Sequence, residues 1–302
     1  MKMKKNLFLA FSLCLSFNVL LAQQTPVFSD YVYNQVLLNP AHAGFYKSTD
    51  LTLTYRNTAS DFVGAPEVLS GVVNAPTKSE NIGIGASVLS DRLGVANITS
   101  ITGSIAYKII FDFHDNRVKW WEYNPNTLTF GLSAGGIVYN EDLLSLGIQD
   151  DPEFAQNINE VVPKLGIGAL YNRQQFYVGV SNTNLIASLY EDKNVSVGSP
   201  TYFYGGLRIY TDIFHTYILK PSFLAKYEKG FAPQFDANFT ASYKNIIEGG
   251  LGYRTNNSAN AMVAFNSQKK WRFMFSYNFA LQEQVLDRSF GILISYRFGG
   301  DI

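Results

Sequence analysis

The sequence predicts an all-β fold, a transmembrane antiparallel β-barrel of about 14 strands with a short N-terminal plug or periplasmic segment. Three observations lead to this prediction. The chain begins like an exported protein, apolar and polar residues alternate in segments of about 9–12 residues, and aromatic residues gather near the segment ends. A soluble sandwich or propeller would also show alternation, but these three features together favour a membrane barrel.

The composition fits a surface that meets lipid. Aromatic residues make up 15% of the chain and charged residues only 16%. Lys and Arg total 24, as do Asp and Glu. This balance gives no sign of a nucleic-acid partner, which would favour a basic patch.

Residues 1–22 are predicted to be a cleaved signal peptide. Three lysines among the first five residues precede an apolar stretch at residues 7–21, and Ala22 is a small residue before the expected cut. The stretch is interrupted by polar residues and is too short for a spanning anchor, which needs about 20 residues. Cys14 is the chain's one cysteine and lies in this leader, so we expect no disulfide in the mature protein.

Residues 49–302 are predicted to form the barrel. In residues 234–244, for example, Phe, Ala and Tyr alternate strictly with polar residues. Candidate strands begin near Thr52, Val68, Ile82, Ile98, Thr127, Pro163, Phe176, Tyr202, Tyr217, Pro233, Ile246, Asn260, Trp271 and Ser289. An even number of strands returns both termini to one side, the periplasm in a bacterial barrel.

Connection lengths support this count and orientation. Periplasmic turns are expected to be short, as at residues 172–175 and 244–245, and external loops longer, as at residues 140–162 and 184–200. One predicted periplasmic connection, residues 112–126, is long and contains Trp120 and Trp121. These tryptophans belong either to the inner aromatic girdle or to a docking element for a periplasmic partner.

Residues 23–48 precede the first strand and are too polar to face lipid, so they are expected to fill the lumen or lie in the periplasm. Asn39 and Pro40 favour a turn, and Gly44 permits backbone angles that other residues resist. Hydrogen bonds to inward polar residues such as Arg56 are expected from Asp30, Tyr31, Tyr33 and Asn34. We hypothesise a plug that closes the pore and shapes a docking surface. A segment needed only for folding is the alternative.

The sequence carries no catalytic signature, so we expect no enzyme and no cofactor. The three histidines, His42, His114 and His215, are scattered without metal-ligand spacing. A Gly-x-Ser-x-Gly elbow is absent, which argues against a barrel hydrolase. The acidic loop at residues 141–153 lacks the spacing of a calcium loop and is expected to be solvated.

Seven sequence blocks, in order, closely resemble the PorP/SprF family of the type IX secretion and gliding-motility machinery. The blocks are SDYVYNQVLLNPAHAG at residues 29–44, YRN at 55–57, GAP at 64–66, NIGIG at 81–85, SDRLG at 90–94, LKPSFLAKY at 219–227 and GYRT at 252–255. The likeness runs from about Gln24 to Phe298, and the block containing Asn39, Pro40 and Gly44 is its most specific part.

The resemblance implies an integral outer-membrane protein that acts as a partner. Members of the family associate with periplasmic ring components of the secretion apparatus, or support export or attachment of a particular secreted surface protein or adhesin. A plugged channel or transporter for a small or hydrophobic solute is the alternative function. A channel would keep an open, charged lumen, whereas a partner-binding barrel can be closed.

Overall fold

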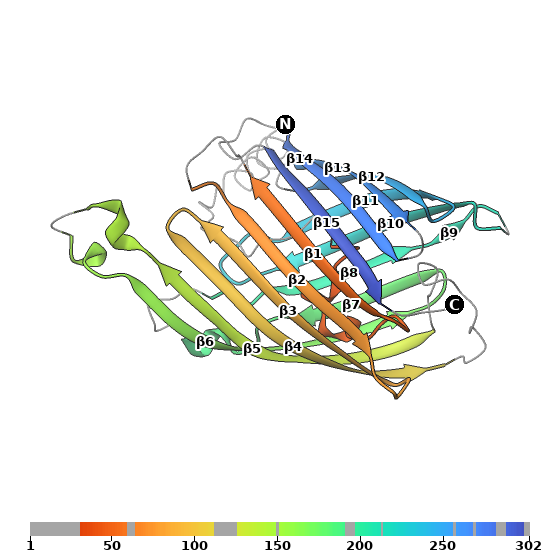
Figure 1. The fold of residues 1–302 in the computed structure, drawn as a ribbon, viewed down its shortest axis with the longest axis horizontal. Coiled ribbons are helices and arrows are strands. Elements are labelled where there is room, and N and C mark those ends of the chain that lie inside the picture. The colour runs from red at the N-terminus through yellow and green to blue at the C-terminus, as the bar shows by residue number, and fades with distance from the viewer. Residues whose placement is uncertain are drawn as a thin grey trace, which may run out of the picture.

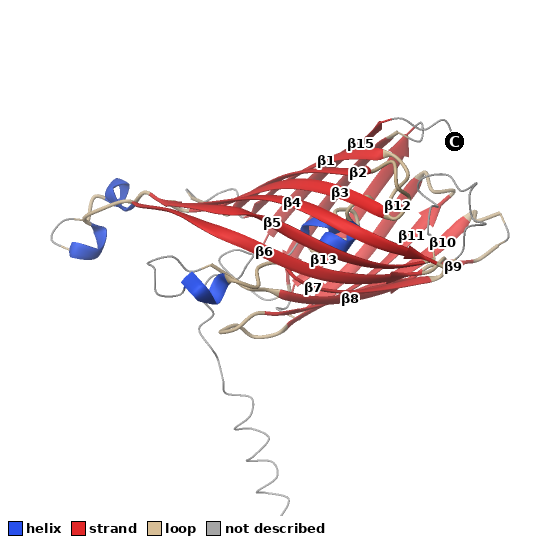
Figure 2. Cartoon of the chain, turned by 90° about the horizontal axis from the view of Figure 1, so that it is seen from below, coloured by secondary structure: helices blue, strands red, loops and turns tan. Residues whose placement is uncertain are grey.

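The computed structural model describes residues 31–58, 64–111, 126–148, 151–190, 197–212, 214–255, 258–267, 270–281 and 288–298. Within these ranges the chain forms one antiparallel sheet that closes on itself. The first strand pairs with the last through ten residue pairs, from Thr49 opposite Phe298 to Thr58 opposite Ser289. Figures 1 and 2 show the resulting ring of tilted strands.

The strands are β1 (Thr49–Thr58), β2 (Glu67–Pro76), β3 (Ile82–Leu93), β4 (Ala96–Ile110), β5 (Thr127–Glu141), β6 (Ile158–Asn172), β7 (Phe176–Asn182), β8 (Thr201–Leu207), β9 (Ile209–Tyr210), β10 (Tyr217–Tyr227), β11 (Gln234–Tyr243), β12 (Ile247–Arg254), β13 (Ser258–Ser267), β14 (Trp271–Ala280) and β15 (Arg288–Phe298). No helix in the described part of the chain is long and apolar enough to cross a membrane.

β8 and β9 are two parts of one crossing, so the barrel has the 14 strands that the sequence predicts. Both parts pair with β10 in the same register, and the gap between them falls at Arg208. Pro221 of β10 lies at the level of this gap. Because proline has no backbone N–H to donate, it interrupts the ladder at that position.

The predicted strand starts are confirmed to within a few residues for all crossings but one. β6 begins at Ile158 rather than near Pro163, so the outer connection after β5 is shorter than predicted. β6 pairs with β7 only from Ile167 onward, so residues 158–166 have a single neighbour, β5. A proline is tolerated there because it lies on a sheet edge.

The amphipathic pattern is inside out relative to a soluble protein. Along β11, buried and exposed residues alternate without exception. The buried ones are Gln234, Asp236, Asn238, Thr240 and Ser242, and the exposed ones are Phe235, Ala237, Phe239, Ala241 and Tyr243. A polar interior and an apolar exterior are what a barrel needs when its outer face meets hydrocarbon.

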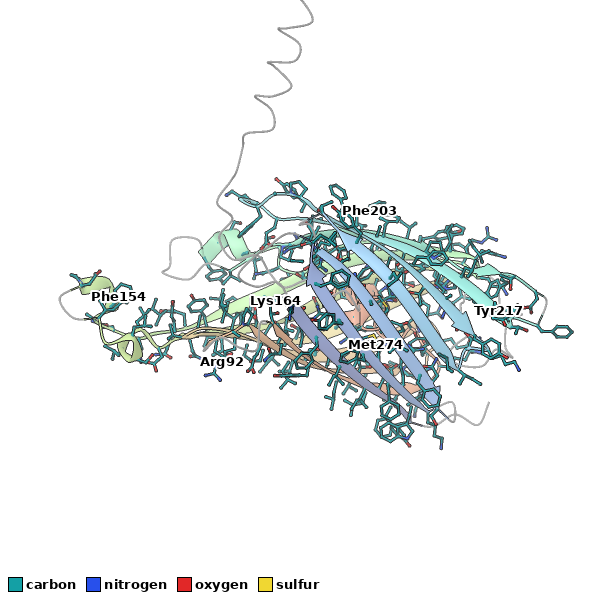
Figure 3. All side chains as sticks on the ribbon, turned by 90° about the horizontal axis from the view of Figure 1, so that it is seen from above. Arg92, Phe154, Lys164, Phe203, Tyr217 and Met274 are labelled. Carbon is teal, nitrogen blue, oxygen red and sulfur yellow. The ribbon has the colours of Figure 1, made fainter. Side chains whose placement is uncertain are left out.

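Aromatic side chains gather near both ends of this apolar exterior. Trp271 and Tyr296 have ring centroids 4.5 Å apart near the end of the barrel that carries the short turns. Near the opposite end, the rings of Tyr55 and Phe290 lie 6.1 Å apart. Phe203, labelled in Figure 3, is one of many exposed aromatic residues between the ends. Such girdles mark the two levels where hydrocarbon gives way to headgroups.

Strands β4, β5 and β6 are longer than the others, with 15 residues each. β4 and β5 pair along their whole length, and residues 158–166 of β6 extend beyond its pairing with β7 at the end opposite the short turns. The connection from β5 to β6 projects there as an arm (Figure 1). This arm carries the short 3-10 helices η4 (Leu143–Leu146) and η5 (Pro152–Phe154) at its tip (Figure 2).

Two leucines with similar exposure test which part of this surface meets lipid. Leu132 on β5 is 55% exposed and Leu144 at the arm's tip is 57% exposed. Replacing Leu132 by Arg is expected to destabilise the barrel by about 2–4 kcal/mol, the cost of a charge deep in the bilayer. Leu144→Arg is expected to change stability by less than about 0.5 kcal/mol. Urea unfolding in lipid vesicles measures both, and equal effects would contradict a lipid-facing Leu132.

Candidate functional site

The described part of the N-terminal segment, residues 31–48, lies inside the ring of strands. Figure 2 shows its helical turns within the barrel. It forms two short 3-10 helices, η1 (Gln35–Leu37) and η2 (Pro40–His42). The Asn39 side chain caps η2 by accepting a 2.8 Å hydrogen bond from the backbone N–H of Ala41. Pro40 follows at the first helical position, where a missing N–H costs nothing.

Three strand glycines let the backbone of this segment approach the wall. A Cβ atom built on Gly131 of β5 would lie 2.2 Å from the backbone nitrogen of Ala41. On Gly168 of β6 it would lie 2.0 Å from Oδ1 of Asn39. On Gly83 of β3 it would lie 2.1 Å from the carbonyl oxygen of Ala43. Only residues without a side chain fit at these three contacts, so β3, β5 and β6 form a close-fitting docking wall.

Asn39 is the central polar contact with this wall. Its Nδ2 lies 3.0 Å from the carbonyl oxygen of Ala169, 3.3 Å from that of Val180 and 2.9 Å from the hydroxyl of Tyr204. The residue is fully buried. Since an unpaired amide in such a place is costly, these bonds fix both the height and the rotation of the segment.

His42 completes a buried group with Tyr204. Its Nε2 is 2.7 Å from the Tyr204 hydroxyl, which also receives the bond from Asn39. The Tyr204 hydroxyl thus links the His42 ring and the Asn39 amide in one buried hydrogen-bond network. Burial, with a smaller contribution from the Arg208 charge, lowers the pKa of His42 to about 3.

The segment leaves the wall through a sharp turn at Gly44. This residue has φ +61°, which favours glycine. Its N–H donates to Oδ1 of Asn74, and its carbonyl oxygen accepts from Nζ of Lys108. The Asn74 amide in turn donates to the carbonyl oxygen of His42 at 3.2 Å. Two polar side chains from β2 and β4 thus satisfy the backbone of the turn.

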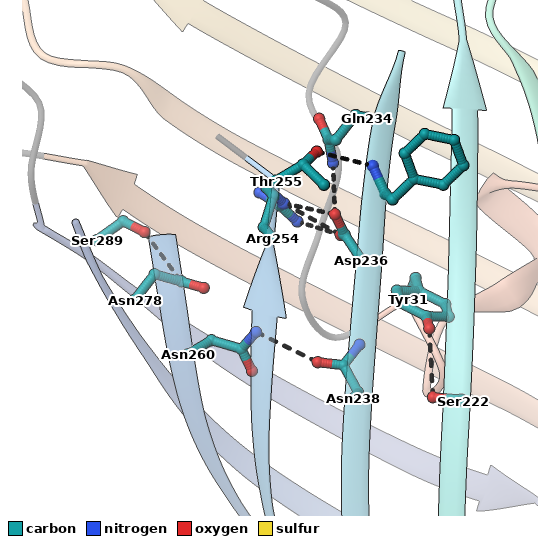
Figure 4. Close-up of polar contacts among 11 residues, drawn as sticks. Tyr31, Ser222, Gln234, Asp236, Asn238, Arg254, Thr255, Asn260, Asn278 and Ser289 are labelled. Carbon is teal, nitrogen blue, oxygen red and sulfur yellow. Dashed lines mark hydrogen bonds and ion pairs between the residues drawn. The ribbon is translucent and has the colours of Figure 1, made fainter. Parts of the chain in front are cut away.

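Long side chains carry the contacts with the opposite wall. The Tyr31 hydroxyl donates to Oγ of Ser222 on β10 at 3.2 Å (Figure 4). The Tyr33 hydroxyl donates to Oε2 of Glu248 on β12 at 2.9 Å. The Asn34 amide is 3.5 Å from Oγ1 of Thr54 on β1, a weak contact. Apart from these bonds, an apolar cluster includes segment and wall residues: Tyr31, Leu38, Ala41, Phe45, Leu170, Tyr177, Tyr202, Tyr204 and Leu224.

Other polar pairs in the described lumen join adjacent strands, as between β11 and β12, or reach across one strand, as between β11 and β13. Arg254 and Asp236 form a 2.7 Å ion pair, and the Asn260 amide donates to Oδ1 of Asn238 at 3.2 Å (Figure 4). Within the described ranges, no three His, Cys, Asp or Glu side chains come together as a metal site requires.

The predicted site residues fall into two groups. Tyr31, Tyr33, Asn34, Asn39, Pro40 and Gly44 lie together in the lumen, where Arg56 is also buried. Asp30, Trp120 and Trp121 lie outside the described residues. The sequence did not predict roles for Tyr204, Asn74 and Lys108, or for the docking glycines, Gly83, Gly131 and Gly168. Isolated glycines within strands, which often mark a close backbone approach, were the available signal for the last of these.

A side chain at Gly131 is expected to weaken docking of the segment. Gly131→Val overlaps the backbone at Ala41 and is expected to cost about 1–3 kcal/mol, as overpacking does. Leu38→Cys, in a Cys14→Ser background, places a buried thiol in the segment as a reporter. Maleimide labelling of that thiol is expected to accelerate in the Gly131→Val variant.

Gly103→Ala on β4 is the matched control, because a Cβ there would meet only the Ala134 carbonyl oxygen at 3.9 Å. Its labelling rate is expected to equal that of the parent. Equal rates in the Gly131→Val and control variants would contradict the close contact.

Docking is also expected to weaken in acid. Since the docked His42 has a pKa near 3 and an undocked histidine one near 6.5, the docked state binds fewer protons between these values. The free energy of docking therefore becomes less favourable by about 1.4 kcal/mol for each pH unit below about 6.5, down to about pH 3. Hydrogen exchange of the segment's amides at pH 7 and 5, corrected for intrinsic rates, measures this effect. His42→Gln is expected to remove it, and an unchanged pH dependence in that variant would refute the assignment.

Comparison with solved structures supports the fold. The toluene transporter TodX of P. putida shares 11% identity and a TM-score of 0.52, with 88% of this chain and 94% of that chain covered. The TodX deltaS2S3 mutant, a monoaromatic hydrocarbon channel, shares 11% identity and a TM-score of 0.50, with 87% of this chain and 94% of that chain covered. The outer membrane protein Omp33 of Acinetobacter baumannii shares 8% identity and a TM-score of 0.48, with 84% of this chain and 100% of that chain covered.

These identities are too low to transfer any function, so the likeness concerns the barrel alone. A comparison with curated proteins gave no match. Residues 20–296 match the family described as "Type IX secretion system membrane protein PorP/SprF". This match spans nearly the whole chain and agrees with the blocks quoted from the sequence. The chain is therefore a member of the PorP/SprF family of type IX secretion system membrane proteins.

Proposed function

We propose that this barrel is an outer-membrane component of the type IX secretion or gliding machinery. It binds periplasmic ring components and supports export or surface attachment of a specific secreted protein. The observation that carries the proposal is the family match over residues 20–296. It requires no catalysis and no cofactor, and the leader at residues 1–22 directs export of the chain and is cleaved from the mature protein.

The end with the short turns faces the periplasm in this proposal. All described connections at that end are tight, such as the turns between β6 and β7 and between β11 and β12. Apart from the connection after β4, the long connections are at the other end with the projecting arm, and that end faces outward. This assignment follows the rule for bacterial barrels, whose external loops are the longer ones.

Charge at the periplasmic end favours a protein partner there. Exposed basic residues of the described short-turn end are Lys47, Lys78, Arg173, Lys244 and Lys270. The acidic residues in the same turns are Glu80 and Asp212. A basic rim of this kind steers and orients an acidic protein surface. Trp120 and Trp121, in the connection after β4, would add aromatic anchors of the type that dominates protein interfaces.

The N-terminal segment acts as a plug in this proposal. It joins facing walls of the lumen through bonds from Asn39, Tyr31 and Tyr33. A closed lumen suits a barrel that binds partners rather than one that conducts solutes. Since both Gly44 and Tyr46 lie near the periplasmic end, the plug also shapes the surface that a periplasmic partner would meet.

Affinity purification tests the partner-binding role. Tagged protein is isolated from its native outer membrane in mild detergent, and its companions are identified by mass spectrometry. Periplasmic ring components or a large secreted surface protein are expected to co-purify. Charge reversal of Lys78, Arg173 and Lys244 to Glu is expected to reduce recovery of the ring components at least about tenfold, since rim charges govern such encounters.

A matched reversal at the other end is the control. Arg92, Lys229 and Arg288 are equally exposed basic residues there, and their change to Glu is expected to leave ring recovery intact. Recovery of a lone barrel while ring components stay in the unbound fraction would overturn the proposal. Measurable conductance of the intact barrel in planar bilayers would then favour the channel function.

A further inference from the structure

A polar cavity of about 90 Å³ lies between the N-terminal segment and the opposite wall. Side chains that line it include Tyr33, Tyr46, Arg208, Lys220, Glu248 and Arg272. Three of these are cations and one is an anion, so the described lining carries an excess of positive charge. The volume holds several water molecules or one small oxyanion.

Neutral groups hold Arg208 at the edge of this cavity. Its Nη1 donates to the carbonyl oxygen of Arg173 at 2.8 Å, and its Nη2 donates to Oδ1 of Asn172 at 3.1 Å. The guanidinium carbon lies 5.0 Å from the ring centre of Tyr177. These contacts fix the orientation of the guanidinium without neutralising its charge.

The single carboxylate of the lining is already shared. Oε1 of Glu248 lies 3.0 Å from Nζ of Lys220. The same side chain accepts from the Tyr33 hydroxyl at 2.9 Å, and from the Asn266 amide at 3.4 Å. Its one negative charge acts on both Lys220 and Arg272, and Arg208 also lines the cavity, so the three cations outnumber the one carboxylate of the lining.

Arg272 is likewise held in a fixed orientation. Its Nε donates to Oδ1 of Asn266 at 2.7 Å, and its guanidinium carbon lies 5.1 Å from the ring centre of Tyr33. Guanidinium groups fixed in this way are suited to bidentate recognition of carboxylates and phosphates. Since excess charge is costly away from bulk water, an anion in this cavity would be stabilised by Coulomb attraction from several sides.

We propose that this cavity is a binding site for a small oxyanion, either phosphate or a carboxylate group. The site is independent of the secretion role. Because Tyr33 and Tyr46 belong to the N-terminal segment, an anion bound there also bridges the segment to Lys220 of β10 and Arg272 of β14, and its binding stabilises the seated segment.

Equilibrium dialysis of the purified full-length barrel, in uncharged detergent with radiolabelled inorganic phosphate, tests the proposal. The parent protein is expected to bind about one phosphate saturably. Arg208→Gln and Arg272→Gln are each expected to weaken binding about tenfold, the usual effect of losing one charge-assisted contact. Arg92→Gln removes the same charge from an exposed position at the other end of the barrel and is expected to leave binding unchanged.

Gln35→Glu provides a second variant in case the arginine variants do not fold. Gln35 lines the cavity, and the substitution adds a negative charge while keeping the side chain's shape. It is expected to abolish phosphate binding. Displacement of phosphate by acetate, or by a peptide with a free but not an amidated C-terminus, assigns the site to carboxylates. Lack of displacement by either assigns it to phosphate.

Two outcomes would overturn the proposal. One is the absence of saturable binding of both phosphate and acetate by the folded parent. The other is equal weakening by Arg92→Gln and by the two cavity variants, because that would show a general charge effect. Neither outcome bears on co-purification with the secretion machinery, so the two proposals fail separately.

Discussion

Everything in this structure follows from the need to pair backbone N–H and C=O groups where no water can reach them. In hydrocarbon a free sheet edge is too costly, so the strands must close into a ring, and the pairing of β1 with β15 over ten residue pairs achieves this. Closure fixes which side chains face inward. The apolar face then lies outside, and the polar residues of every strand converge on a lumen that must satisfy them.

The N-terminal segment helps to satisfy that lumen. Two polar side chains of the wall, Asn74 and Lys108, bond the backbone of the turn at Gly44, while Asn39 bonds backbone oxygens of β6 and β7. The segment and the wall therefore satisfy each other, because each supplies hydrogen bonds to buried polar groups that would otherwise be unpaired. Such networks impose one arrangement when they are complete, which makes the segment a defined part of the barrel rather than a loose tail.

The strand pattern was predictable because alternation with period two is a local property of the chain. The 14 crossings, their order and most of their starts follow from it. Pro163 misled the prediction, because whether a proline is tolerated depends on the neighbouring strand, and β7 does not reach that far. The docking glycines illustrate the same limit. Gly131 and Gly168 lie opposite each other through the register of β5 and β6, and nothing local to either shows that Asn39 and Ala41 will lie against them.

The lumen is packed differently on its two sides, and this difference accounts for the cationic cavity. On the side of β3, β5 and β6, the segment lies directly against glycines, with its backbone at Gly83 and Gly131 and the Asn39 side chain at Gly168. On the side of β10, β12 and β14, Tyr31 and Tyr33 supply the described hydrogen bonds to the wall, both through their hydroxyl groups. Long side chains bridge a gap without filling it, so space remains around them. Polar strand residues line that space, and among these the basic ones outnumber Glu248. Close packing of the segment against one wall therefore leaves the positively charged cavity beside the other wall.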